Sequence, residues 1–165
     1  MLTGGVKSVL DLGAGMGLNS LYCTSFGADV TAIDKKDFPE YLKGHPKIKL
    51  LNDSIESLSW GDGHYDLVIL NSVIPFLTKD FFKEKLVPAI MESLNPGGFV
   101  YISAFLPNDP VFSKNSKASL YSAQELLDIF STFSMVEKEE KSVNDNHPPL
   151  GPHEHQIVKI VFKKK

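Results

Sequence analysis

Val9-Leu10-Asp11-Leu12-Gly13-Ala14-Gly15-Met16-Gly17 is the stretch that decides the fold of this chain. Its apolar beginning is typical of a buried strand, and it runs directly into three glycines at alternate positions. An apolar segment of helical length, residues 18–26, follows. Glycines in such a turn let the backbone approach a ligand closely, and the helix N-terminus beyond presents unpaired N–H groups to a polar or anionic group. The stretch therefore predicts a strand–turn–helix unit that binds a ligand at its turn.

Short apolar runs alternate with longer amphipathic segments along the chain, which is typical of a layered α/β sheet. The expected strands are residues 6–12, 29–33, 48–51, 65–70, 99–103, 135–141 and 156–162. The expected helices are residues 18–26, 39–43, 79–94 and 122–133, the last opening with a capping box. Residues 104–118 and the proline- and histidine-rich residues 144–155 are predicted as loops. The pattern predicts one α/β domain over residues 1–165, with a Rossmann-like seven-stranded, mostly parallel sheet, a C-terminal antiparallel hairpin and helices on both faces.

The composition narrows the chemistry that the chain can perform. All 17 Lys+Arg residues are lysines, so no guanidinium group is available for bidentate anion binding. The formal net charge of -3 lacks the positive excess of a nucleic-acid-binding domain. The single cysteine, Cys23, excludes a disulfide framework and a multi-cysteine metal site. No apolar run approaches the roughly 20 residues that span a bilayer, so we expect a cytoplasmic protein without a membrane partner.

The spacing of the glycines distinguishes two nucleotide-binding patterns. A dinucleotide fingerprint places its third glycine at position 18, which is Leu18 here. The pattern is instead GxGxG, with Asp11 two residues before Gly13. In this form the sequence resembles the class I S-adenosylmethionine-dependent methyltransferases, and the resemblance extends over nearly the whole chain. It implies S-adenosyl-L-methionine as the cofactor.

The resemblance assigns cofactor-binding roles to residues at the ends of the expected strands. Asp34 ends the second strand, where a carboxylate can accept from both hydroxyls of a ribose. Asp53 would accept from the adenine amine, although it could instead only cap a turn. Asn71 would lie beside the methionine end and the methyl acceptor. The full implied set is Asp11, Gly13, Gly15, Gly17, Asp34, Lys35, Asp53, Ser54, Ile55 and Asn71, in which Asp11 is expected to organise the loop by binding its amides.

A histidine cluster, His147, His153 and His155, is the second candidate site. In an extended segment residues 153 and 155 point to the same side, so two imidazoles could face one cleft. Either could act as a general base on a hydroxyl or thiol, and we expect Asn71, His153 and His155 at the reacting end. Three close histidines could also bind a metal, but no carboxylate has an obviously matching position, so no metal is predicted. The alternative is a stiff proline-rich loop with exposed histidines.

The residues after the fourth strand bear on the methyl acceptor. Methylation of amines on nucleic-acid bases in this superfamily uses an Asn/Asp-Pro-Pro-aromatic segment, whereas residues 71–76 read NSVIPF. A small-molecule O, S or N nucleophile is therefore the expected acceptor. A similar ending, with an HxH sequence, an apolar strand and a basic tail, is found in small methyltransferases of the tellurite-resistance type.

Two features leave other functions open. Family members commonly carry helices before the first motif that help to cover the cofactor, whereas eight residues precede Val9 here. Residues 104–118, or a second subunit in a homodimer, would then have to cover it. A non-catalytic S-adenosylmethionine-binding sensor or partner subunit is one alternative function, and a nicotinamide-dependent oxidoreductase, disfavoured by Leu18, is another.

Overall fold

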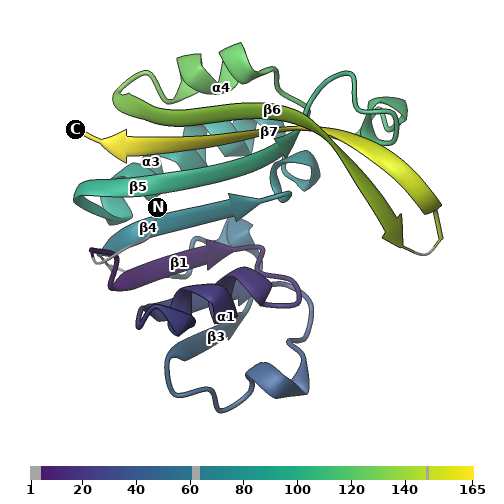
Figure 1. The fold of residues 1–165 in the computed structure, drawn as a ribbon. Helices are drawn as coiled ribbons and strands as arrows, with labels where there is room; N and C mark the ends of the chain where they lie inside the picture. Colours follow the sequence, from purple (N-terminus) through teal and green to yellow (C-terminus); the bar gives the residue numbers. More distant parts are fainter. Residues whose placement is uncertain (1–4, 61–63, 148) are drawn as a thin grey trace.

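A seven-stranded sheet organises the molecule, which we describe from a computed structural model covering residues 5–60, 64–147 and 149–165. The strand order is β3-β2-β1-β4-β5-β7-β6 (Figure 1). The pairs among the first five strands are parallel, and β7 pairs antiparallel with both β5 and β6. The predicted Rossmann-like mixed sheet with a C-terminal antiparallel hairpin is thus confirmed.

The strands occur where the apolar runs predict them. They are β1 (Ser8–Leu12), β2 (Asp29–Asp34), β3 (Ile48–Asn52), β4 (Tyr65–Asn71), β5 (Leu94–Phe105), β6 (Phe133–His147) and β7 (Gly151–Lys164). Four consecutive residues of β4 illustrate the reason, since Leu67, Val68, Ile69 and Leu70 are all buried. A strand covered on both faces reads as a continuous apolar run.

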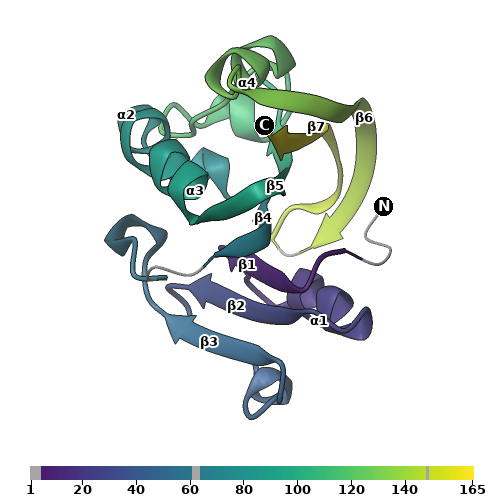
Figure 2. The ribbon, with the colours of Figure 1, turned by 90° about the vertical axis from the view of Figure 1, so that its left-hand side faces the viewer.

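Helices cover both faces of the sheet, and each face has its own core (Figure 2). On one face α1 (Leu18–Ser25) packs on β1 and β2 around Val9, Val30 and Ile69. On the other face lie α2 (Lys79–Phe81), η4 (Phe82–Leu86), α3 (Val87–Ser93) and α4 (Ala123–Ile129). The short turns η1 (Glu40–Leu42), η2 (Ile55–Ser57), η3 (Ile74–Phe76) and η5 (Phe112–Lys114) complete the elements.

The helix predicted over residues 79–94 is interrupted by a π-helical turn at η4. Pro88 follows this turn near the start of α3. A proline has no N–H and cannot donate to the carbonyl four residues earlier, so the backbone widens its turn there. The capping box predicted for α4 is present, because the Ser122 hydroxyl accepts from the Glu125 N–H and the Glu125 carboxylate accepts from the Ser122 N–H.

The prediction that residues 144–155 form a loop is wrong. β6 and β7 stay paired from Phe133↔Lys164 to His147↔Gly151, and this hairpin bends away beyond the rest of the sheet (Figure 1). Pro152, which suggested a loop, lies at the outer end of β7, where only β6 pairs with it. A proline is tolerated at such an edge position because a missing N–H breaks few ladder bonds there.

Candidate active site

The carboxyl ends of the parallel strands form one edge of the sheet, and this edge collects most of the predicted cofactor residues. The register places Leu12 beside both Ile33 and Leu70, so the glycine loop, Asp34 and Asn71 leave the sheet next to one another. In open α/β sheets ligands bind in the crevice at this edge. The topology thus brings together residues that are far apart in the sequence, as the prediction requires.

The three glycines of the loop all have positive φ, between 55° and 72°, but they differ in their surroundings. A Cβ at Gly13 would lie 2.6 Å from Cγ2 of Val73, and one at Gly17 would overlap the side chain of Leu42. At Gly15, by contrast, no atom lies within 4 Å of the Cβ position. Gly13 and Gly17 therefore permit close packing behind the loop, while Gly15 leaves its backbone open to an approaching ligand.

Asp34 organises the glycine loop. Its Oδ2 accepts from the Gly15 N–H at 2.8 Å, and its Oδ1 accepts from the Lys36 N–H at 2.8 Å. The side-chain amide of Asn52 adds bonds to the carbonyls of Asp34 and Lys36. The carboxylate predicted to bind a ribose is therefore held against the most open residue of the loop. Lys35 is exposed beside it.

Asp11 does not bind the loop amides, and that expectation is wrong. The N–H groups of Gly13 and Ala14 donate to the Ile33 carbonyl instead, and that of Gly15 donates to Asp34. Asp11 is 1% exposed on the α1 face of β1, because alternate residues of a strand point to opposite faces. Its Oδ2 accepts from the Ser20 hydroxyl at 2.7 Å and so fixes α1 to β1.

The second oxygen of Asp11, Oδ1, is buried and has no hydrogen-bond partner within the described part of the chain. Burial raises the pKa of this carboxyl to about 6, against the lowering effect of the Ser20 hydrogen bonds and with a smaller raising effect of the Asp34 charge. A buried acceptor without a partner is costly for a fold to keep. Oδ1 of Asp11 is therefore an acceptor that the described part of the fold leaves unsatisfied.

Asp53 and its neighbours form a capped turn. Asp53 accepts from the Ser54 N–H at 2.7 Å and from the Ser57 hydroxyl at 2.8 Å. The Ser59 hydroxyl, followed by these two donors, holds the pKa of Asp53 below its usual range. Ile55 is 7% exposed and its side chain packs in the core behind Gly13, while its cofactor contact stays a prediction. The capping alternative for Asp53 is thus observed, while its adenine contact stays a prediction.

Backbone strain marks the end of β4. Asn71 is exposed there, and the next residue, Ser72, has φ 58°, a left-handed conformation that costs a non-glycine residue roughly 1–2 kcal/mol. The Ser72 N–H donates to the Ser103 carbonyl at 2.8 Å, which holds this conformation in place. Such strained residues cluster at functional sites. The observation fits a role for this segment at the reacting end of the site.

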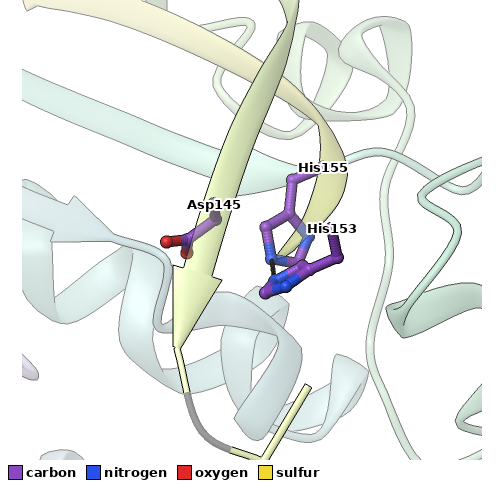
Figure 3. A group of neighbouring side chains, drawn as sticks. All are labelled: Asp145, His153 and His155. Carbon is purple, nitrogen blue, oxygen red and sulfur yellow. Dashed lines mark hydrogen bonds between the residues drawn. The ribbon is translucent and has the colours of Figure 1, made fainter. Parts of the chain in front are cut away.

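His155 lies on β7 at the same edge and is buried, so the alternative of exposed histidines in a loop is wrong for this residue. Its ring packs 4.6 Å from that of Phe105 and 5.9 Å from that of Phe112, measured between centroids. Its Nε2 is 3.0 Å from Nε2 of His153, so the two predicted histidines do face each other (Figure 3). The side chain of His147 lies outside the described residues.

The sequence analysis missed Asp109, which is fully buried in the segment between β5 and α4. Its Oδ2 lies 2.9 Å from Nδ1 of His155 and accepts from the Gln156 N–H, and its Oδ1 accepts from the N–H groups of Val111 and Phe112. Burial acts to raise the pKa of Asp109, but these hydrogen bonds outweigh it and the pKa is lowered. Residues 104–118 were predicted as a loop, but nothing in the local sequence indicated the contact with His155.

We expect Asp109→Ala to reduce the free energy of unfolding by about 2 kcal/mol, since three backbone donors and an imidazole lose their acceptor in a buried place. Urea unfolding followed by circular dichroism would measure it. Asn108→Ala, at the exposed neighbouring position, is the matched control and should change stability by less than about 0.5 kcal/mol. Equal effects of the two substitutions would contradict an anchoring role for Asp109.

A groove among the described residues lies elsewhere. It measures about 370 Å³ and crosses the α1 face of the sheet, where Tyr22 and Cys23 face Phe99, Tyr101 and Val161. None of the predicted site residues lines it. We therefore locate the candidate active site at the carboxyl edge of the strands and not in this groove.

Comparison with known proteins identifies the family. The family model described as "Tellurite resistance protein TehB" matches residues 5–148. The chain belongs to the TehB family. The resemblance to class I S-adenosylmethionine-dependent methyltransferases is thereby confirmed, including the tellurite-resistance subgroup indicated by the end of the sequence.

Curated relatives of this TehB-family chain carry a methyltransferase name. It is 28% identical to the "Probable S-adenosyl-L-methionine-dependent methyltransferase TehB" of Haemophilus influenzae strain 10810, covering 82% of this chain and 52% of the relative. The chain thus spans about half the length of the curated relatives it matches.

Solved structures share the fold. The crystal structure of TehB from Haemophilus influenzae has a TM-score of 0.78 at 22% identity and covers 99% of this chain and 59% of that one. The N-methyltransferase NodS from Bradyrhizobium japonicum WM9 has a TM-score of 0.73 at 15% identity and covers 98% of this chain and 88% of that one. At these identities the likeness concerns the fold. No helix among the described residues is long and apolar enough to cross a membrane.

Proposed function

We propose that this chain catalyses S-adenosylmethionine-dependent methyl transfer to a small-molecule O, S or N nucleophile. The observation that carries the proposal is the glycine loop at Gly15. No atom lies within 4 Å of the Cβ position of Gly15, and the Asp34 carboxylate accepts from the Gly15 N–H. Relatives support it, because NodS was crystallised with S-adenosyl-L-homocysteine, as was a didemethyltoxoflavin N1-methyltransferase from Burkholderia thailandensis. S-Adenosylmethionine supplies a sulfonium-bound methyl group that is already electrophilic, so the protein mainly has to orient the reactants and exclude water.

The residues at the edge fit this cofactor. The orphaned Oδ1 of Asp11 can accept from the ammonium of the methionine portion as it passes over Gly15. Asp34 can take the ribose hydroxyls with the lone pairs that its two loop bonds leave free, since an ionised carboxylate has about four acceptor sites. Asp53 and Ser54 follow β3, the strand next to β2, and would bind the adenine. No phosphate has to be bound, which fits a chain without arginine.

Asn71 and the histidine pair are the residues that we place at the acceptor. Asp109 faces Nδ1 of His155 with a carboxylate, which requires a hydrogen on Nδ1 and leaves Nε2 as a proton acceptor. His155 can therefore remove a proton from a hydroxyl or thiol as it attacks the methyl group, with His153 beside it. Asp109 acts through His155 and is a positioning residue.

Calorimetric titration of the full chain with S-adenosylhomocysteine and, separately, with NAD tests the cofactor. We expect heat of binding with S-adenosylhomocysteine alone. Absence of binding would overturn the proposal, and binding of NAD alone would favour an oxidoreductase. A labelled-methyl assay over thiols, phenols, amines and oxyanions then separates an enzyme from a non-catalytic sensor that only binds the cofactor.

A further inference from the structure

The outer part of the β6–β7 hairpin gathers two imidazoles and a carboxylate on one face (Figure 3). Asp145 on β6 pairs directly with His153 on β7, and His155 follows two residues along the same strand. Paired residues and their i+2 neighbours project from the same side of an antiparallel ribbon. One ligand atom from each of the three side chains lies within 4.8 Å of the others. The strand pairing therefore gives Asp145 a position that matches the two histidines, which was not obvious for any carboxylate from the sequence.

The hydrogen bonds of the two rings determine where the lone pairs of their Nε2 atoms point. Nδ1 of His155 faces a carboxylate oxygen of Asp109 at 2.9 Å, and Nδ1 of His153 faces the Gly151 carbonyl at 2.7 Å. Both partners only accept, so each Nδ1 carries a hydrogen, and each ring in its neutral form presents the lone pair of its Nε2. These two Nε2 atoms face each other at 3.0 Å. Two lone pairs in this arrangement repel unless a proton or a metal ion lies between them.

The two imidazoles match a metal site in both their inner and their outer contacts, with the carboxylate of Asp145 within 4.8 Å of them. Two imidazole nitrogens on one tetrahedral Zn²⁺ are about 3.3 Å apart, given Zn–N bonds of about 2.0–2.1 Å, and the observed separation is 3.0 Å. Histidines that bind a metal generally donate their other N–H to a carboxylate or a backbone carbonyl, and Asp109 and Gly151 supply one of each. Asp145 would complete a two-histidine, one-carboxylate set that leaves positions open for water or another ligand.

We propose that Asp145, His153 and His155 form a binding site for one divalent transition-metal ion, with Zn²⁺ as the ion that suits the ligands best. Nitrogen ligands exclude Ca²⁺ and Mg²⁺, which prefer oxygen. The ion would occupy Nε2 of His155, so the proton-accepting role proposed above belongs to the metal-free protein. The site does not depend on the methyltransferase proposal, because its ligands and its test involve neither the cofactor nor a methyl acceptor.

Zn²⁺ titration of the chelator-treated full chain in a calorimeter tests this site. We expect one ion per chain, together with visible ligand-field absorption when Co²⁺ replaces Zn²⁺. His153→Gln should weaken Zn²⁺ binding by at least roughly 100-fold, and Asp145→Asn by at least roughly tenfold, through the loss of one ligand each. Both side chains are less buried than His155, whose replacement could disturb the fold. Circular dichroism checks that each variant is folded.

His64→Ala is the matched control, since this histidine is exposed and lies outside the cluster, and it should leave Zn²⁺ affinity unchanged. Absence of Zn²⁺ binding by the native chain would overturn the proposal and would mean that the two rings share a proton. Binding that persists unchanged in the double variant Asp145→Asn/His153→Gln would also overturn it, because the ion would then sit elsewhere.

Discussion

Replacing Asp34 by alanine is expected to weaken S-adenosylhomocysteine binding by at least roughly 100-fold, or about 2.7 kcal/mol. The carboxylate has two tasks in the proposed complex, since it accepts from the Gly15 N–H and would accept from the ribose hydroxyls. Hydrogen bonds to a charged group are worth about 1.5–3 kcal/mol each, so the loss of two or more accounts for an effect of this size. Isothermal calorimetry measures it directly.

Asp37→Ala is the matched control for Asp34, because it removes an exposed carboxylate three residues further along the same segment. We expect it to change the affinity by less than threefold. The 2′-deoxy analogue of S-adenosylhomocysteine separates ribose binding from loop organisation. The native protein should bind this analogue more weakly than it binds S-adenosylhomocysteine. The Asp34→Ala variant should bind the two compounds with the same affinity. If Asp34→Ala binds the parent compound as the native chain does, the ribose assignment is wrong.

Asp11→Asn is expected to gain stability relative to the native chain as the pH rises. The pKa of Asp11 in the fold, about 6, is above its ordinary value of 3.8, so the folded state holds the proton more tightly than the unfolded state. Ionisation therefore costs the native chain nothing below about pH 4, and the cost grows until about pH 6. From 3.8 to about 6 the penalty amounts to about 3 kcal/mol.

Urea unfolding of both proteins at pH 4 and pH 7 measures this effect. The difference in unfolding free energy, variant minus native, should rise by about 3 kcal/mol between the two pH values, because asparagine does not ionise. A pH-independent difference for Asp11→Asn would contradict a raised pKa at this position.

The same variant tests the proposed ligand contact of Asp11. If its orphaned Oδ1 accepts from the cofactor ammonium, Asp11→Asn should bind S-adenosylhomocysteine at least roughly tenfold more weakly than the native chain does at pH 7. The affinity would then fall at the pH at which the substitution is expected to favour stability. Unchanged affinity would restrict Asp11 to its structural bond with Ser20. Opposite effects on stability and affinity are the signature of a residue kept for function.

Features that depend on neighbouring residues were predictable from the sequence. The strand β4 was predictable because an apolar run of its length is stable only inside a sheet. The turn at Gly13, Gly15 and Gly17 was predictable because positive φ is costly for every other residue, and all three glycines have it. The capping box at Ser122 was predictable because both of its hydrogen bonds join residues three positions apart.

Features that depend on contacts between distant segments were not predictable. Asp34 has the loop-organising role that was expected of Asp11, because the strand alternation points Asp11 toward Ser20 while the parallel register brings Asp34 beneath Gly15. The link from Asp109 to His155 spans 46 residues, and no local pattern encodes it. The hairpin extends through a proline-containing segment because the pairing with β6 outweighs the local preference for a loop.

The sequence by itself determined the layered α/β sheet, the glycine turn and the acids at the strand ends, since hydrophobic period and glycine placement act over a few residues. Only the tertiary structure decided which atoms of those acids remain available, and only the strand register placed Asp145 beside His153 and His155. The physical reason is that a hydrogen bond or a coordination bond needs two atoms within about 3 Å, and folding alone sets that distance between residues remote in the chain.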